Sequence, residues 1–136
     1  MARWLAMAAL LCWASAVYSQ GNSLDREIKA APGREVRVSV YSSIRPDCTA
    51  GPLPAIRLAV APEHGIVTVR RAMLKATNVK QCLAVEVPAF VAFYRASQDL
   101  KSDDRFELEV SFAAGRKQIQ RFHVSISNAP NNGQRI

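Results

Sequence analysis

The side chains best suited to chemistry in this sequence are three cysteines, two histidines and a short run of aspartates. Cys12 lies in an apolar N-terminal stretch, whereas Cys48 and Cys82 lie in the body of the chain. If the chain is exported, the last two predict one disulfide bond, which should stabilise the fold by roughly 3–4 kcal/mol. Two free thiols are the alternative. A zinc site is disfavoured, because CxxC spacing and nearby histidines do not accompany these cysteines.

The two histidines do not form a metal-binding pattern. His64 precedes Gly65 in a sequence typical of a turn. His123 falls on the polar face of a predicted strand and is expected to lie opposite Glu107. Apart from Glu63 beside His64, acidic companions do not stand at close spacing, so copper or zinc binding is disfavoured and no cofactor is expected.

Three aspartates, Asp99, Asp103 and Asp104, cluster before the last predicted hairpin. Calcium requires several oxygen ligands from one loop, so calcium binding is one interpretation of the cluster. Lys101 and Arg105 lower the negative charge of this segment. We therefore predict instead that Asp104 accepts hydrogen bonds from backbone amides of its loop.

Motifs for catalysis are missing from the sequence. It contains neither Gly-x-Ser-x-Gly nor a Gly-rich phosphate loop, and a Cys–His pair is not expected once Cys48 and Cys82 are bonded. The chain is therefore expected not to be an enzyme.

Basic residues are the remaining chemical signal, and the formal net charge is +7. Two predicted connections are rich in lysine and arginine, and together they define a basic set: Arg70, Arg71, Lys75, Lys80, Arg116, Lys117 and Arg121. Such a set can hold an anionic polymer, lipid head groups or an acidic protein, and a solvated surface is the alternative. Nucleic acid is not an expected partner, because an aromatic stacking platform does not accompany the charges.

The N-terminus predicts where the protein goes. Arg3 precedes an apolar run over residues 4–17, which is too short and too near the terminus for a membrane span. This pattern predicts a secretory signal peptide over residues 1–19, cleaved after Ser19 or alternatively after Ala16. An uncleaved anchor is a rival interpretation, and lipidation of Cys12 is disfavoured because Leu11 precedes it. The mature protein is then expected to be periplasmic or secreted, without a transmembrane segment.

The rest of the chain is expected to hold one domain. Residues 20–33 are polar and of mixed charge and are predicted to be a flexible leader, residues 34–127 the domain, and residues 128–136 a disordered tail.

The clearest structural signal is the last hairpin, residues 104–126. Apolar residues alternate with polar ones through Phe106, Leu108, Val110 and Phe112, which predicts a strand with one buried face. A two-residue turn at Ala114-Gly115 would place Phe122 opposite Glu107. A β-bulge near Gln120-Arg121 would correct this mismatch and pair Glu109 with Arg121.

Other strands are predicted over residues 35–41, 55–60, 66–69, 82–87 and 89–94, with Pro88 dividing the last two. Val36, Val38 and Val40 are expected on the core face of the first, and Ile56, Leu58 and Val60 on that of the second. Residues 55–69 are expected to form a second hairpin, residues 42–54 a proline-rich loop, and residues 70–81 a helical turn or loop. Seven short strands without a long helix predict an all-β, antiparallel β-sandwich.

Two segments resemble a known family. Residues 62–69 read Pro-Glu-His-Gly-Ile-Val-Thr-Val, and Leu100 to Phe106 read Leu-Lys-Ser-Asp-Asp-Arg-Phe a few residues after Tyr94. They are similar to the "P-x-H-G-x-V-x-V", "Y-x-P" and "F-x-G-x-D-x-F" segments of bacterial Ig-like, cadherin-like modules of exported proteins. Here Ala96, Leu100 and Ser102 replace the proline, first aromatic and glycine of those patterns. The resemblance implies an Ig-like β-sandwich with His64 in a structural role.

The functional expectation is a non-catalytic Ig-like module that binds a protein in the cell envelope. The alternative is a structural or stress-related envelope protein that captures anionic polymer through its basic loops.

Overall fold

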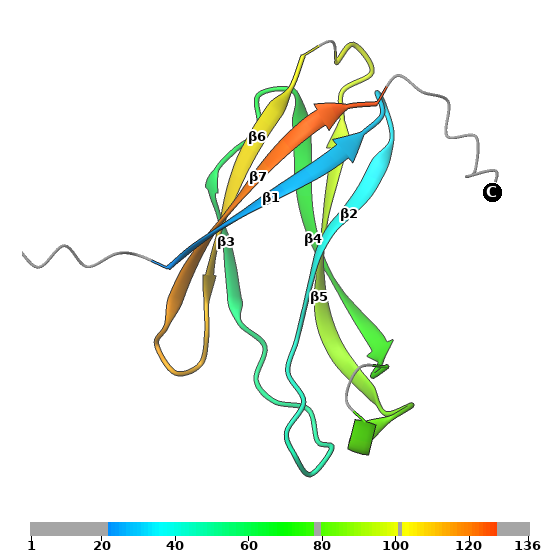
Figure 1. The fold of residues 1–136 in the computed structure, drawn as a ribbon, viewed down its shortest axis with the longest axis vertical. Helices are drawn as coiled ribbons and strands as arrows, with labels where there is room; N and C mark the ends of the chain where they lie inside the picture. The colour runs from blue at the N-terminus through cyan, green and yellow to red at the C-terminus, as the bar shows by residue number, and fades with distance from the viewer. Residues whose placement is uncertain (1–21, 78–79, 101, 128–136) are drawn as a thin grey trace, which may run out of the picture.

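The computed structural model describes residues 22–77, 80–100 and 102–127, which form a β-sandwich (Figure 1). Seven strands make up the described part of the chain, together with a single short 3₁₀ turn. The elements are β1 Ser23–Ala30, β2 Glu35–Ser42, β3 Ala55–Val60, β4 Gly65–Lys75, η1 Lys80–Cys82, β5 Glu86–Ala96, β6 Asp104–Ser111 and β7 Lys117–Ile126. The all-β prediction is therefore confirmed.

The strands form two sheets, which Figure 1 shows as two layers. One sheet has the order β1-β7-β6-β3 and the other the order β2-β5-β4. Neighbouring strands are antiparallel except β1 and β7, which are parallel. The β2–β3 connection and η1 lie at the same end of the molecule (Figure 1).

The core lies between the two sheets and is built around stacked aromatic rings. Tyr94, Phe106 and Phe122 are each 0% exposed. The Phe106 ring stacks on Tyr94 at a centroid distance of 5.6 Å and on Phe122 at 4.7 Å. Leu108, Val110 and Val124 complete this cluster. The predicted core face of β6 is thus confirmed, because all its alternate apolar residues are buried or half-buried.

The register of the last hairpin corrects the predicted bulge. The ladder is regular: Phe106 pairs with Phe122 and Glu107 with Arg121, whereas Glu109 pairs with Ile119. The extra residue is in the turn instead, because the Phe112 N–H donates to the Arg116 carbonyl at 2.8 Å and closes a three-residue loop. Gly115 in that loop has φ of 81°, a left-handed conformation that favours glycine.

The same register changes two other expected pairs. The bulge near Gln120-Arg121 and the Glu109–Arg121 pair are both wrong. His123 lies opposite Arg105 rather than Glu107. Because the side chain of Ile119 is on the outer face, Gln120 is on the core face and is only 4% exposed.

The expected flexible leader contains a strand. Residues 23–30 form β1 and pair with β7 over eight positions, from Ser23 opposite Ile119 to Ala30 opposite Ile126. Ala30 is buried and Ile28 packs against the core. Most residues of β1 are polar and exposed, and only those near its end are buried or half-buried. Such a composition resembles that of a flexible leader.

Strands β3 and β4 do not form the expected hairpin. β3 pairs with β6 in one sheet, and β4 pairs with β5 in the other, so the turn between them crosses from sheet to sheet. β4 also runs on to Lys75, where a helical turn or loop was expected.

Register shifts also alter two predicted faces. A shift between Arg37 and Ser39 turns Val40 away from the core and brings Tyr41 inward. A shift between Leu58 and Val60 places Val60 opposite Glu107 on the outer face, whereas Leu58 stays opposite Leu108 but is 41% exposed. The predicted core faces of these strands hold for Val36, Val38 and Ile56.

The predicted signal peptide over residues 1–19, its cleavage site and the predicted tail over residues 128–136 lie outside the described residues.

Candidate functional site

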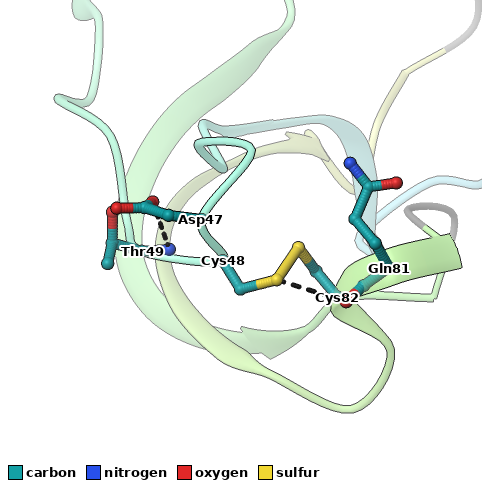
Figure 2. The surroundings of a disulfide bond; sticks show 5 residues. All are labelled: Asp47, Cys48, Thr49, Gln81 and Cys82. Carbon is teal, nitrogen blue, oxygen red and sulfur yellow. Dashed lines mark hydrogen bonds between the residues drawn. A yellow bond between two sulfur atoms is a disulfide. The ribbon is translucent and has the colours of Figure 1, made fainter.

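Cys48 and Cys82 form a disulfide bond, as the sequence predicts. Cys48 and Cys82 have an S–S distance of 2.15 Å and a Cα–Cα distance of 5.3 Å. The bond joins the β2–β3 loop to η1, and Figure 2 shows it between these two segments. A disulfide is typical of proteins that fold in an oxidising, non-cytoplasmic compartment.

The loop on the Cys48 side is ordered by local hydrogen bonds. Asp47 Oδ1 accepts from the Thr49 N–H at 3.1 Å and from the Thr49 hydroxyl at 2.6 Å (Figure 2). These bonds hold the pKa of Asp47 below its ordinary value. Cys48 itself has φ of 68°, which is uncommon for a residue with a side chain. The loop therefore reaches η1 in a defined conformation.

Asp104 accepts more hydrogen bonds than any other carboxylate in the described chain. It accepts hydrogen bonds from the N–H groups of Glu63 and His64, both at 3.0 Å, and from Arg105 at 2.9 Å. The Tyr94 hydroxyl donates a fourth at 2.8 Å. The predicted role of Asp104 in bonding backbone amides is confirmed.

The same contacts set the pKa values in this corner. Burial alone would raise the pKa of Asp104, but the Tyr94 hydroxyl and the backbone N–H donors favour the charged form and lower it. The pKa of the Tyr94 hydroxyl is raised by burial and then by the adjacent carboxylate. A Cβ on Gly65 would lie 2.5 Å from the Tyr94 ring, so glycine is required at that position. The corner is a structural anchor that joins both segments of the resemblance.

The remaining candidate metal ligands lie apart from one another. His64 Nε2 is 3.8 Å from Glu63 on the turn, and His123 Nε2 is 3.9 Å from Asp25 on the outer face of β1. Asp99 accepts a hydrogen bond from the Ser97 hydroxyl, and Asp103 is exposed. Among the described residues, three or more such side chains do not gather anywhere as a possible metal site.

The structure divides the basic set between the two sheets. Arg70, Arg71 and Lys75 lie on β4, and Lys80 lies in η1. The other members lie in the last hairpin: Arg116 in the turn, with its guanidinium 4.8 Å from the Phe112 ring, and Lys117 and Arg121 on β7. The set is therefore not one continuous patch.

Charges on the outer face of the β1-β7-β6-β3 sheet compensate one another. Arg57 lies 3.0 Å from Glu109, and Lys117 lies 3.9 Å from the same carboxylate. Hydrogen bonding from Arg57 is the main reason that the pKa of Glu109 is lowered. Arg121 is 3.1 Å from Glu107. This face therefore offers little uncompensated charge.

The outer face of the β2-β5-β4 sheet differs, because arginines surround one aromatic ring there. Phe93 pairs with Arg37 on β2, and the Arg70 guanidinium lies 4.4 Å from the centre of the Phe93 ring. Arg95 lies two residues along β5, on the same face as Phe93 because strand residues alternate. Glu35 is the one acidic residue of this face within the described chain, and it lies 2.5 Å from Arg70. We call Arg37, Arg70, Phe93 and Arg95 the arginine face.

Sequence reasoning found Arg70 but missed Arg37 and Arg95. Both alternate with core residues in their strands, and that alternation is a signal that was available. What the sequence did not show is that β2, β5 and β4 are neighbours, which brings the three guanidinium groups onto one sheet face.

An apolar cleft lies elsewhere, between the end of β2 and the last hairpin. Its volume is about 430 Å³, and its lining includes Tyr41, Pro52, Pro54 and Phe112. The Tyr41 hydroxyl donates to Gln120 Oε1 at 2.6 Å, so the long-range bond satisfies the buried amide oxygen. Burial is the main reason that the pKa of Tyr41 is raised. Charged side chains do not line the described part of this cleft.

In the described part of the chain, no helix is both long enough and apolar enough to cross a bilayer.

Comparisons with known proteins add little to this geometry. Neither a family model nor a curated protein matches the sequence. The solution structure of amebosin aligns with a TM-score of 0.42 and 8% sequence identity, covering 79% of this chain and 98% of that one. A likeness this low assigns neither a family nor a function.

Proposed function

We propose that this chain is an Ig-like β-sandwich module of the periplasm or cell exterior that binds an anionic partner through the arginine face. The strand order supports the Ig-like part of the proposal. The β2-β5-β4 and β7-β6-β3 orders correspond to the two sheets of a seven-strand immunoglobulin topology, with the first strand paired to the last. The disulfide and the predicted signal peptide support export.

The observation that carries the binding proposal is the charge difference between the two outer faces. On one face, Arg57, Lys117 and Arg121 each lie 3.0–3.9 Å from a carboxylate, whereas the arginine face holds three arginines beside one glutamate. Guanidinium groups bind carboxylate, sulfate and phosphate groups through paired hydrogen bonds. Phe93 supports Arg70 from below, because a cation over an aromatic face is attracted to the ring. An anion would therefore meet preoriented donors.

Binding to dextran sulfate, a defined polyanion, tests this function. The double variant Arg37→Glu, Arg95→Glu should bind about tenfold more weakly or worse than the parent protein, because like charges would then oppose the polymer. Binding should also weaken as salt rises to about 0.3 M, where screening is short-ranged.

Two control variants locate the binding surface. Lys117→Glu with Arg121→Glu changes charge by the same amount on the compensated face and should bind nearly as the parent does. Lys75→Glu with Lys80→Glu, here called the loop variant, changes the end of β4 and η1 and tests the alternative that basic residues around the β4–β5 connection capture an anionic envelope polymer. If the loop variant loses binding and the arginine-face variant does not, the arginine face is not the site and the loop alternative replaces it.

A further inference from the structure

Strand β4 has a free edge along its full length. It is the last strand of the β2-β5-β4 sheet and runs for 11 residues. Backbone bonds at its two ends, Ser97 N–H to the His64 carbonyl at 2.9 Å and Ala76 N–H to the Val85 carbonyl at 2.8 Å, fix which residues bond to β5. Because hydrogen-bonded pairs alternate along an antiparallel ladder, the even-numbered residues of β4 direct their backbone N–H and C=O groups toward β5. The odd-numbered ones therefore direct their N–H and C=O groups toward the free edge, where the described residues supply no partner strand.

Apolar side chains on the core side of the sandwich are partly exposed to solvent beside this edge, and we call this exposed apolar strip the seam. Val69 pairs with Ala92, which is 0% exposed, yet Val69 itself is 38% exposed. Leu58 on β3 pairs with Leu108 at 1% exposure and is 41% exposed. Met73, on the same face of β4 as Val69, is 60% exposed. Leu58 and Val69 thus lie next to buried core residues of the neighbouring strands, yet they remain partly exposed to solvent.

Exposed apolar side chains lie on the core side of this edge. Among the eight large apolar side chains that are exposed in the described residues, three face the core side of β3 and β4: Leu58, Val69 and Met73. Val60 and Ile66 on the same strands face outward instead, opposite Glu107 and Arg95. An apolar strip beside an unpaired strand edge is the arrangement that an added strand fills, because main-chain bonds supply affinity and alternate side chains supply specificity.

Charge selects the occupant of the edge. Arg70 and Arg71 stand at the centre of β4, and Lys75 stands at its end. A second copy paired antiparallel across this edge would place these arginines opposite or beside one another in every register that pairs at least about nine residues of the strand. Like charges so placed destabilise a pair of strands. A segment that carries carboxylates would instead be attracted, and Arg71 makes no ion pair within the described chain.

From these observations we infer that the free edge of β4 adds a strand from an extended, acidic segment of another protein. Apolar residues of that segment lie opposite Val67, Val69 and Met73 and close the unsealed seam. Its carboxylates lie opposite Arg70, Arg71 and Lys75. This inference goes beyond the proposed function, since it uses the strand edge and the exposed apolar side chains beside it; Arg70 is the one residue that it shares with the arginine face.

A synthetic peptide with this complementary pattern serves as the probe. In antiparallel pairing from Lys75 back to Val67, its sequence is Glu-Thr-Val-Thr-Glu-Glu-Val-Thr-Val. The same peptide with lysine at each glutamate is the control. The parent protein should bind the acidic peptide at least about tenfold more tightly, because the lysine peptide opposes like charges. Equal binding of the two peptides overturns the inference.

Two variants test the edge itself. Val69→Pro removes an N–H that faces the free edge and leaves the β5 ladder intact, since proline is tolerated on edge strands at such positions. It should abolish binding of the acidic peptide. Arg71→Glu should weaken binding of the acidic peptide and strengthen binding of the lysine peptide. This exchange of preference does not depend on how well the proline variant folds. Unchanged peptide binding by both variants contradicts strand addition.

Different variants test the inference and the proposed function, so one can be contradicted without the other. Val69→Pro should still bind dextran sulfate, and Arg37→Glu with Arg95→Glu should still bind the peptide. Sedimentation of the parent protein supplies the last outcome. A dimer that Val69→Pro dissociates would show that a second copy occupies the edge, and the acidic segment would then be the wrong occupant.

Discussion

The single carboxylate of Asp104 connects three segments, because it accepts hydrogen bonds from the turn before β4, from β5 and from the second residue of β6. Its partners Glu63 and His64 precede β4, whereas Tyr94 lies near the end of β5. A carboxylate suits this position better than an amide, since both of its oxygens accept and neither donates. The aspartate is therefore held in its charged form by the fold.

Asp104→Asn should lower the free energy of unfolding by about 2–4 kcal/mol at pH 7, because the amide nitrogen would face N–H or O–H donors. The folded-state pKa of Asp104 lies below the unfolded value of about 3.9. The carboxylate thus stabilises the fold above about pH 4, and this contribution is lost as the pH falls through the folded pKa. Urea unfolding at pH 7 and at acid pH measures the difference between the two proteins, which should shrink in acid.

Asp103→Asn is the matched control, because Asp103 is exposed and adjacent in sequence. Its unfolding free energy should change by less than about 0.5 kcal/mol. If Asp104→Asn costs the same amount at both pH values, the charged form of Asp104 is not what stabilises the corner.

At the residue scale, the sequence predicted roles where the cause is local. Asp104 follows a loop and begins a strand, and side-chain bonds to backbone amides are common at such positions. Gln120 shows the opposite case. Its buried amide is satisfied by Tyr41, 79 residues away, so a polar residue on a core face was not predictable from the hairpin alone.

At the element scale, alternation predicted which residues of β6 face the core but not the length of the turn that follows. Two-residue and three-residue turns differ by one position in register, and every pair beyond the turn changes with them. Gly115 is compatible with either turn. The sequence pattern therefore left the register open, and the closing Phe112–Arg116 bond decides it.

Pro88 illustrates a second limit of sequence reasoning about strands. Proline is expected to divide a central strand, yet β5 runs through it. By the same alternation that orients β4, the missing N–H of Pro88 would face the β2 side. β2 pairs with β5 only as far as Ser42 opposite Ala89, so the ladder loses no bond at Pro88. The neighbouring strand's length permits the proline.

The disulfide acts on two loops rather than on the core. Replacing Cys48 and Cys82 with serine should lower the free energy of unfolding by about 3–4 kcal/mol, because the unfolded chain regains the freedom of a closed loop. Circular dichroism should still show a β-sheet spectrum, since neither cysteine belongs to the main core cluster. Denaturant unfolding of the parent and the double variant provides the comparison.

Thiol counting before and after reduction checks the bond in the parent protein. The native protein should show no reactive thiol from these two residues until reductant is added. Two reactive thiols without reductant, or a double variant as stable as the parent, would contradict a stabilising bond.

At the scale of the whole molecule, the two sheets present different outer surfaces. One pairs its charges within the sheet, and the other leaves arginines beside an aromatic ring. Composition gave the net charge of +7 but not its distribution, which depends on which strands are neighbours. Strand neighbours come from long-range pairing, and single-strand periodicity contains no information about it.

The first strand gives the last prediction, because it decides where the domain begins. β1 pairs with β7 over eight positions, and its Ile28 and Ala30 contact or join the core. A chain that begins at residue 31 would lose this burial and leave the β7 edge unpaired. Compared with a chain that begins at residue 20, it should unfold with a free energy lower by about 1–3 kcal/mol. Its unpaired β7 edge should also promote association, because an open strand edge pairs with other chains. Denaturant unfolding and sedimentation of the two chains measure both effects. Equal stability and equal monomer content would mean that residues 23–30 act as the leader their composition predicts.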